Sequence, residues 1–93
     1  MLAESTIAAV RDFSGIVECV SQYVTLKKRG RNFIGLCPFH SEKTPSFTVS
    51  SEKQIFHCFG CHESGDLIAF VQKVDTLSFS ESVIQIAQFA GIS

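Results

Sequence analysis

The sequence lacks any long apolar run and any recognisable leader segment. A membrane-spanning helix needs about 18 or more consecutive apolar residues, and no stretch of the chain approaches that length. The first residues, MLAEST, supply neither the basic region nor the apolar segment of a secretory signal peptide. We therefore expect a soluble, cytoplasmic protein with no membrane partner. In that compartment thiols stay reduced, so clustered cysteines more often bind a metal than form disulfides.

The sequence also lacks the side-chain sets that commonly carry out catalysis. It has no paired carboxylates, no Gly-rich phosphate-binding loop and no Ser/His/Asp combination. From its own residues we therefore expect a binding domain without catalytic residues. The 93 residues correspond to one domain, 1–93, of a size that can fold alone but often needs a metal or disulfides to do so.

Cysteine and histidine are plentiful for this length, with four and three copies. They include two similarly spaced pairs, Cys37-x-x-His40 and, after a 17-residue spacer, Cys58-x-x-Cys61. Zinc binds four sulfur or nitrogen ligands as a tetrahedron, and two ligands three apart on a tight turn can supply two of its vertices. Because four protein ligands leave no position for water, the predicted zinc ion is structural rather than catalytic.

Other uses of these residues are less well supported. A nucleophile and base within the first pair would lack an evident third group to orient them. A redox motif at 58–61 would normally open a helix beside a βαβ pattern, and none precedes it. His57 and His62 flank the second pair, and either could replace a ligand, although each adjoins a better-placed cysteine. Cys19 is better explained as a small core residue than as a ligand.

The order of the predicted elements gives the fold class. Apolar residues recur at helical spacing near both ends, and short β-branched or aromatic segments fill the middle. Ser78 and Glu81 form a capping-box pattern, and Gly91 is a typical helix stop. We therefore expect an α+β fold, a small zinc ribbon with an antiparallel sheet flanked by short N-terminal and C-terminal helices. The expected helices are 4–12, 15–23, 64–74 and 78–90, and the expected strands are 23–27, 31–36, 46–50 and 54–58.

A three-residue loop, 28–30, is predicted between the first two strands, with Gly30 in the left-handed position. Opposed residues of paired strands point to the same face, so this register gives one outward face that is basic and aromatic. Phe33 is the aromatic residue that we expect to be exposed there, and Gly35 leaves room for a close approach. The predicted pairs are Lys27 with Arg31, Thr25 with Phe33, and Tyr23 with Gly35.

Positive charge is concentrated in the middle of the chain. Six of the eight basic residues lie between positions 27 and 53, whereas both ends carry net negative charge. This distribution favours a polyanionic partner for the middle segment, with a solvated turn as the alternative. The six residues are Lys27, Lys28, Arg29, Arg31, Lys43 and Lys53.

The segments KKRGRNFIGLCPFHSEKTPSF, EKQIFHCFGC and ESGDLIAF together resemble the N-terminal zinc-binding domain of bacterial DNA primases of the DnaG type. The resemblance covers nearly the whole chain and implies a zinc ribbon that binds single-stranded DNA template and helps to select the initiation site for RNA primer synthesis. It implies bacterial, nucleoid-associated localisation. The implied zinc ligands are Cys37, His40, Cys58 and Cys61. The implied DNA-binding residues are Arg31, Lys43 and Lys53, to which the predicted outward face adds Lys27 and Phe33.

The resemblance also implies what lies outside this chain. A separate catalytic domain would carry the DNA-directed RNA polymerase activity, which is a nucleotidyltransferase reaction, and would bind its Mg²⁺. The zinc-binding domain would contact that catalytic domain in cis or in trans. Contact with the replicative helicase would belong to other parts of the parent protein. One departure from the family pattern is His62, where a small residue, often Gly, is common. Two other interpretations stay open, namely a structural zinc ribbon for protein–protein contact and the zinc domain of a phage primase–helicase.

Overall fold

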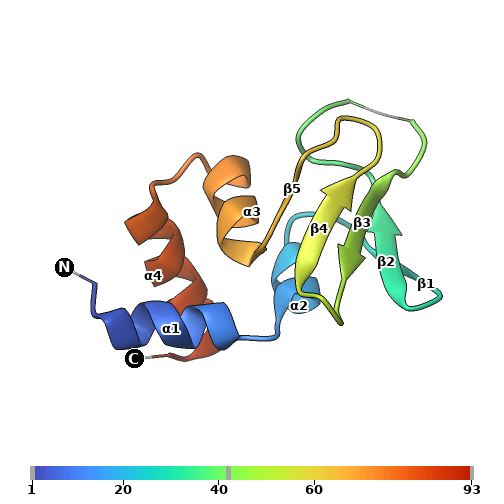
Figure 1. The fold of residues 1–93 in the computed structure, drawn as a ribbon. Coiled ribbons are helices and arrows are strands. Elements are labelled where there is room, and N and C mark those ends of the chain that lie inside the picture. Colours follow the sequence, from blue (N-terminus) through green and yellow to red (C-terminus); the bar gives the residue numbers. More distant parts are fainter. Residues whose placement is uncertain (1, 42, 93) are drawn as a thin grey trace.

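The computed structural model describes residues 2–41 and 43–92. A five-stranded antiparallel sheet, ordered β1-β2-β3-β4-β5, lies beside a group of helices contributed by both ends of the chain (Figure 1). The predicted α+β class is therefore confirmed. The elements are α1 (Glu4–Asp12), α2 (Ile16–Val20), β1 (Lys27–Arg29), β2 (Asn32–Gly35), β3 (Phe47–Ser50), β4 (Ile55–Cys58), β5 (Ser64–Gly65), α3 (Leu67–Val74) and α4 (Phe79–Ala90). None of these helices within the described ranges is long and apolar enough to span a membrane.

The C-terminal helices begin and end at the residues that their capping groups favour. Asp66 accepts a hydrogen bond from the Ala69 amide at the start of α3, and Ser78 and Glu81 form the predicted capping box at the start of α4. Gly91 ends α4 with φ +74, the left-handed conformation that glycine adopts without steric cost.

Helix α2 is shorter than predicted, and its first amide donates a hydrogen bond to a distant side chain. The Ile16 amide donates to Gln54 Oε1 at 3.1 Å, although the two residues are 38 positions apart. Gln54 lies in the β3–β4 turn at φ +56, and its Nε2 donates to the Ser51 carbonyl oxygen at 2.5 Å. The turn of the sheet thereby caps the helix.

The register of the first hairpin differs from the prediction. Lys27 pairs with Ile34, not with Arg31. The connection is a two-residue loop, Gly30-Arg31, in which Gly30 has φ +64. Two-residue loops that begin with glycine match the twist of the paired strands, which explains the preference for this shorter loop. The shift in register is an odd number of residues, so the predicted composition of the two faces was wrong.

Phe33 consequently faces the interior. It pairs with fully buried Val49, and its half-buried ring packs against the core. Gly35 is buried as well, and a Cβ added there would lie 2.5 Å from the Thr25 carbonyl oxygen. The close approach that Gly35 permits is therefore made by the chain's own backbone and not by a ligand.

The opposite side of the sheet, here named the outward face, follows from the strand pairings. Residues that pair across neighbouring strands point to the same side, and the helices α2 and α3 contact the other side through β3 and β4. The outward face comprises Lys27, Arg29, Asn32, Ile34, Thr48, Ser50, Ile55, His57 and Ser64.

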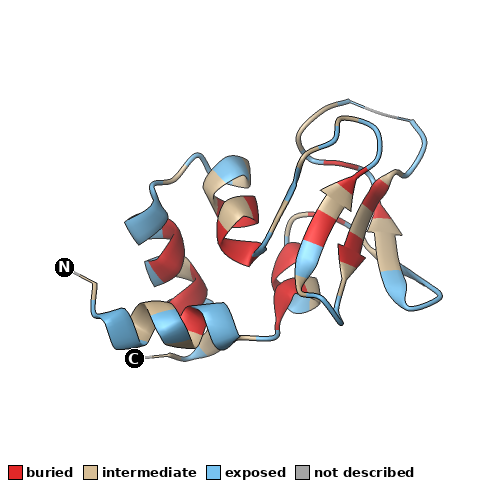
Figure 2. Ribbon diagram, in the orientation of Figure 1, coloured by how far each residue is buried: buried red, intermediate tan, exposed pale blue. Residues whose placement is uncertain are grey.

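The core between the sheet and the helices is built around aromatic rings. Phe47, Phe56 and Phe70 are fully buried, and their ring centroids lie 5.6 to 5.9 Å apart. In Figure 2 most of the buried residues lie on β3 and β4 and on the sides of α2, α3 and α4 that face the interior. Burial of these rings, at about 25 cal/mol per Å² of apolar surface, holds the helices on the sheet.

Candidate metal centre

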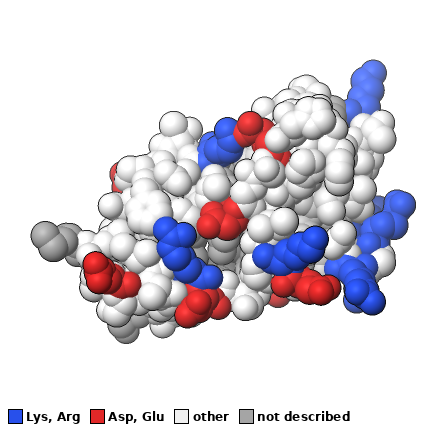
Figure 3. Space-filling view, in the orientation of Figure 1, with Lys and Arg blue, Asp and Glu red and all other residues white. Residues whose placement is uncertain are grey.

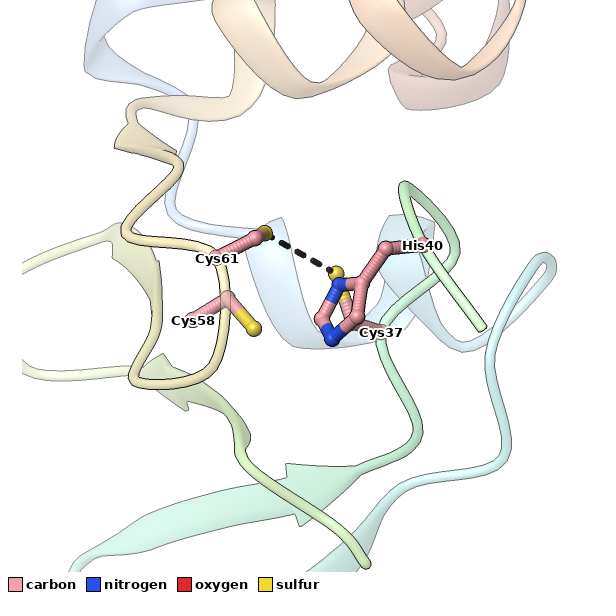
Figure 4. Close-up of side chains that lie close together, drawn as sticks. All are labelled: Cys37, His40, Cys58 and Cys61. Carbon is pink, nitrogen blue, oxygen red and sulfur yellow. Dashed lines mark hydrogen bonds between the residues drawn. The ribbon is translucent and has the colours of Figure 1, made fainter. Parts of the chain in front are cut away.

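Two tight turns bring the predicted ligands together. Cys37 and His40 form the first knuckle, residues 37–40, in the loop after β2. Cys58 ends β4, and Cys61 lies in the turn that follows; residues 58–61 are named the second knuckle. One possible ligand atom from each of the four residues lies within 4.8 Å of the others, and Figure 4 shows the side chains pointing toward one another.

The spacing of the sulfur atoms fits tetrahedral zinc. The Sγ atoms of Cys37 and Cys61 are 3.8 Å apart. A tetrahedron with zinc–sulfur bonds of about 2.3 Å has sulfur–sulfur edges of about 3.8 Å. Three thiols and one imidazole are the donor set of a closed, structural zinc site, so the four residues could hold one such ion.

The spacer between the knuckles forms the hairpin that closes the site. Cys58 pairs with Phe47, which pairs on its other side with Gly35, only two positions before Cys37. The Phe59 amide also donates to the Ser46 carbonyl oxygen at 2.9 Å. Strand pairing thus places the second knuckle beside the first.

The three clustered thiols differ in acidity. Burial raises the pKa of Cys37 to about 12 and also raises the pKa of Cys61. At Cys58 burial acts in the same direction, but hydrogen bonds from the Cys61 and Gly60 amides and from the Ser46 hydroxyl outweigh it and lower the pKa to about 7. Cys58 is therefore the cysteine that most readily forms the thiolate that binds a metal ion. A bound cation would also favour the thiolate form of Cys37 and Cys61.

The second knuckle ends in a left-handed residue. His62 has φ +66, and its amide donates to the Cys58 carbonyl oxygen at 2.8 Å. This conformation explains why glycine suits the position and shows that histidine can adopt the same turn at some steric cost.

The first knuckle is joined to the core through Phe39. Its ring centroid lies 6.2 Å from that of Phe47 and 5.7 Å from those of Phe56 and Phe70. Lys73 Nζ on α3 lies 5.8 Å from the centroid of the same ring. The metal cluster and the aromatic core are therefore parts of one packed unit.

The alternative ligands lie elsewhere. His57 is on the outward face, with its ring centroid 4.4 Å from that of Phe59. Neither His57 nor His62 belongs to the cluster of the four ligand atoms. Cys19 is 3% exposed on α2, where burial raises its pKa to about 11, and it is a core residue as predicted.

Two grooves open on the outward face. The first, named the Phe59 groove, has a volume of about 340 Å³ and is lined by residues that include Arg31, Asn32, Thr48, Lys53, His57 and Phe59. The second, named the Leu36 groove, has a volume of about 380 Å³ and is lined by residues that include Thr25, Lys27, Arg29, Ile34, Leu36 and Pro45.

The structure thus separates the predicted DNA-binding residues. Arg31 and Lys53 line the Phe59 groove, and Lys27 lines the Leu36 groove. Lys43 is exposed in the loop before β3, outside the lining of either groove, whereas Phe33 faces the core. The DNA contact of Phe33 stays a prediction, but the face on which it was based is not the one observed.

Phe59 is the residue that the sequence reasoning missed. Its side chain is 66% exposed beside the cations of its groove. Its position in Cys58-Phe59-Gly60-Cys61 does not by itself predict this exposure, because Phe39, which also stands between two ligands, packs against the core.

Figure 3 shows Lys and Arg side chains gathered around the sheet end of the molecule, near the β1–β2 hairpin. The cations on or beside the outward face are Lys27, Arg29, Arg31 and Lys53. This surface combines positive charge, polar strand residues and the exposed ring of Phe59, and the Glu52 carboxylate also lines the Phe59 groove.

Comparison with known proteins gives consistent matches. The CHC2 zinc finger family matches residues 2–93. The chain is 50% identical over 90 residues to a DNA primase of Staphylococcus aureus (strain COL) and 53% identical over 89 residues to a DNA primase of Listeria monocytogenes serovar 1/2a. These alignments cover 97% and 96% of this chain but only 15% and 14% of those proteins. The fold matches a crystal structure of the Aquifex aeolicus primase, described as its zinc binding and RNA polymerase domains, with a TM-score of 0.87 and 39% identity over 99% of this chain and 23% of that chain.

Proposed function

This chain belongs to the CHC2 zinc finger family, the zinc-binding domain of DNA primases, and on that basis we propose that residues 1–93 form the template-binding domain of a primase. In this proposal the domain binds single-stranded DNA and helps to select the initiation site for RNA primer synthesis. Nucleotidyl transfer and its Mg²⁺ ions belong to a catalytic domain outside the chain, which this domain meets in cis or in trans. Contact with the replicative helicase belongs to other parts of the parent protein.

The zinc ion has a structural role in this proposal. Cys37, His40, Cys58 and Cys61 hold it, and it cross-links the loop after β2 to the end of β4. The spacing of the cluster and its donor set support the assignment. In this proposal zinc holds the second knuckle in place and thereby fixes the position of Phe59, which lines the groove.

The observation that carries the DNA-binding proposal is the exposed Phe59 ring beside Arg31 and Lys53. Single-stranded DNA is bound by cations that follow the backbone and by aromatic rings that stack on the bases. The Phe59 groove provides both groups, and its lining also contains polar strand residues and one carboxylate, that of Glu52. Exposed Lys43 adds a backbone contact outside the groove.

Substitution of the exposed ring tests this function. Stacking of one base on an aromatic ring contributes about 1–3 kcal/mol, so Phe59→Leu should weaken oligothymidylate binding by about fivefold or more while zinc content and melting stay the same. Phe79→Leu is the matched control, because Phe79 is also exposed but lies on α4. Unchanged affinity in Phe59→Leu would remove the groove from the DNA site. A domain that binds no single-stranded DNA would support the protein-contact alternative.

A further inference from the structure

The Leu36 groove lies on the same side of the sheet as the Phe59 groove. Ile34, which lines the Leu36 groove, pairs with Thr48, which lines the Phe59 groove. Likewise Arg29 of the Leu36 groove pairs with Asn32 of the Phe59 groove. Paired residues point to one face, so the two grooves are neighbours on a continuous surface.

The distance between the grooves suits one polymer strand. The Leu36 groove lies over β1 and β2, and the Phe59 groove extends from β2 to β4. Adjacent strands are about 4.8 Å apart, so the groove centres are separated by about 7 Å across the sheet. An extended single strand covers that distance with one or two nucleotide steps.

The Leu36 groove contains the two kinds of group that a nucleotide needs. Lys27 and Arg29 are exposed and can pair with phosphate. Leu36 is 50% exposed, and with Ile34 and Pro45 it provides an apolar surface on which the face of a base can lie. This surface has no aromatic ring among the groove's described lining, so it should hold a base less tightly than Phe59 does.

The position of exposed apolar side chains supports a shared function for the grooves. Among the described residues, the large exposed hydrophobic side chains fall into two groups. One group, Phe79, Ile84 and Phe89, lies on α4, and the other, Leu36, Ile55 and Phe59, lies in these grooves. Apolar contact surface therefore follows the same path across the sheet as the cations.

From this arrangement we propose that the Leu36 groove is a second nucleotide subsite, which holds a base of the same single strand that occupies the Phe59 groove. The inference rests on the proposed function, because it extends the DNA path from β3–β4 to β1–β2. A single strand is the occupant that matches the exposed Lys27 and Arg29 and the continuity with the first groove. The strand thus crosses the sheet and contacts it at two successive places.

The dependence of binding on oligonucleotide length tests this subsite. The dissociation constants of thymidine 5′-monophosphate (dTMP) and dT8 are measured by NMR titration of the zinc-loaded 93-residue chain and of Leu36→Ser. We expect Leu36→Ser to bind dTMP as the unsubstituted chain does, because a single nucleotide cannot reach both grooves and its strongest contacts are at Phe59. It should bind dT8 about three- to tenfold more weakly, a smaller effect than the loss of an aromatic stack. Ile84→Ser is the matched control, since Ile84 is 46% exposed on α4, and it should leave both constants unchanged.

The outcomes distinguish this subsite from the proposed function itself. If Leu36→Ser binds dT8 with unchanged affinity while Phe59→Leu weakens the binding of both dTMP and dT8, the second subsite is overturned and the DNA-binding function stands. Equal weakening of dTMP and dT8 in Leu36→Ser would overturn it too, because the groove would then be part of the first contact. If neither variant alters binding, both the subsite and the Phe59 groove are wrong.

Discussion

The ring of Phe39, in the first knuckle, packs edge-to-face against the ring of Phe70 in α3, with 5.7 Å between their centroids. Phe39 lies between the candidate zinc ligands Cys37 and His40 in the sequence. Its contact with Phe70 therefore connects the first knuckle to the packing between the sheet and the helices. Zinc binding and core packing should therefore stabilise each other. Loss of either should be detected in both the metal affinity and the melting temperature.

Removal of the metal should unfold the domain. Structural zinc in small domains contributes a free energy of folding on the order of 10 kcal/mol, and the first knuckle packs its Phe39 ring against Phe56 and Phe70 of the core. A strong chelator should abolish the cooperative melting transition measured by circular dichroism, and Cys61→Ser should do much the same. A Cys61→Ser protein with one bound zinc and an unchanged melting temperature would contradict the ligand assignment.

Truncation of Phe39 should affect both properties. Phe39→Ala removes ring contacts to Phe47, Phe56 and Phe70, and such truncations cost about 3 kcal/mol or more. The free energy of unfolding, measured by denaturant titration, should fall by that amount, and a competing chelator should remove zinc at lower concentration. Phe79→Ala on α4 is the control and should change the metal affinity little. Loss of stability without any change in metal affinity would show that the knuckle and the core are not coupled.

Replacement of His62 by glycine should stabilise the protein. His62 has φ +66, a conformation that costs a non-glycine residue about 1–2 kcal/mol, partly offset by the greater freedom of glycine in the unfolded chain. We expect His62→Gly to raise the free energy of unfolding by about 0.5–1 kcal/mol. Ser51→Gly, in the β3–β4 turn at a residue without positive φ, should lower it instead. A destabilised His62→Gly protein would show that the imidazole makes a contact worth more than the strain.

Ser82 offers a second stabilising substitution. Its side chain is fully buried in α4, and its hydroxyl has no hydrogen-bond partner among the described residues. A buried polar group without a partner costs about 1–3 kcal/mol, so Ser82→Ala should raise the melting temperature by about 4–8 °C. Exposed Ser80→Ala, also in α4, measures the part of the gain that comes from helix propensity alone. An equal gain in both variants would mean that the buried hydroxyl is satisfied.

Local patterns predicted most of the fold. The capping box at Ser78 and Glu81 and the stop at Gly91 define α4 through contacts within a few residues, and the structure confirms them. The two Cys/His pairs are also local, and pairing of β3 with β4 suffices to bring them together. The two-residue strand β5 (Ser64–Gly65) was not predicted, because a segment so short carries no periodicity.

The register of the first hairpin could not be predicted in this way. Gly30 suits either the third position of a three-residue loop or the first position of a two-residue loop. Which of the two loops forms depends on β3, because Phe33 pairs with Val49 and points to the interior in the observed register. That contact joins residues from different hairpins, so nothing in the sequence of the loop itself specifies it. Because the wrong register exposed Phe33, the exposure of Phe59 in the structure was not predicted.

The most direct test of the central claim, that the outward face binds single-stranded DNA, is the salt dependence of that binding. Fluorescence anisotropy with a labelled oligothymidylate should give a log–log slope between about −2 and −4 for the zinc-loaded chain, since each neutralised phosphate contributes about −0.7. Arg31→Gln should bind more weakly and flatten the slope by about 0.7, whereas Arg11→Gln on α1 should change neither quantity. An affinity independent of salt, or an Arg31→Gln protein with the affinity and slope of the unsubstituted chain, would contradict this account.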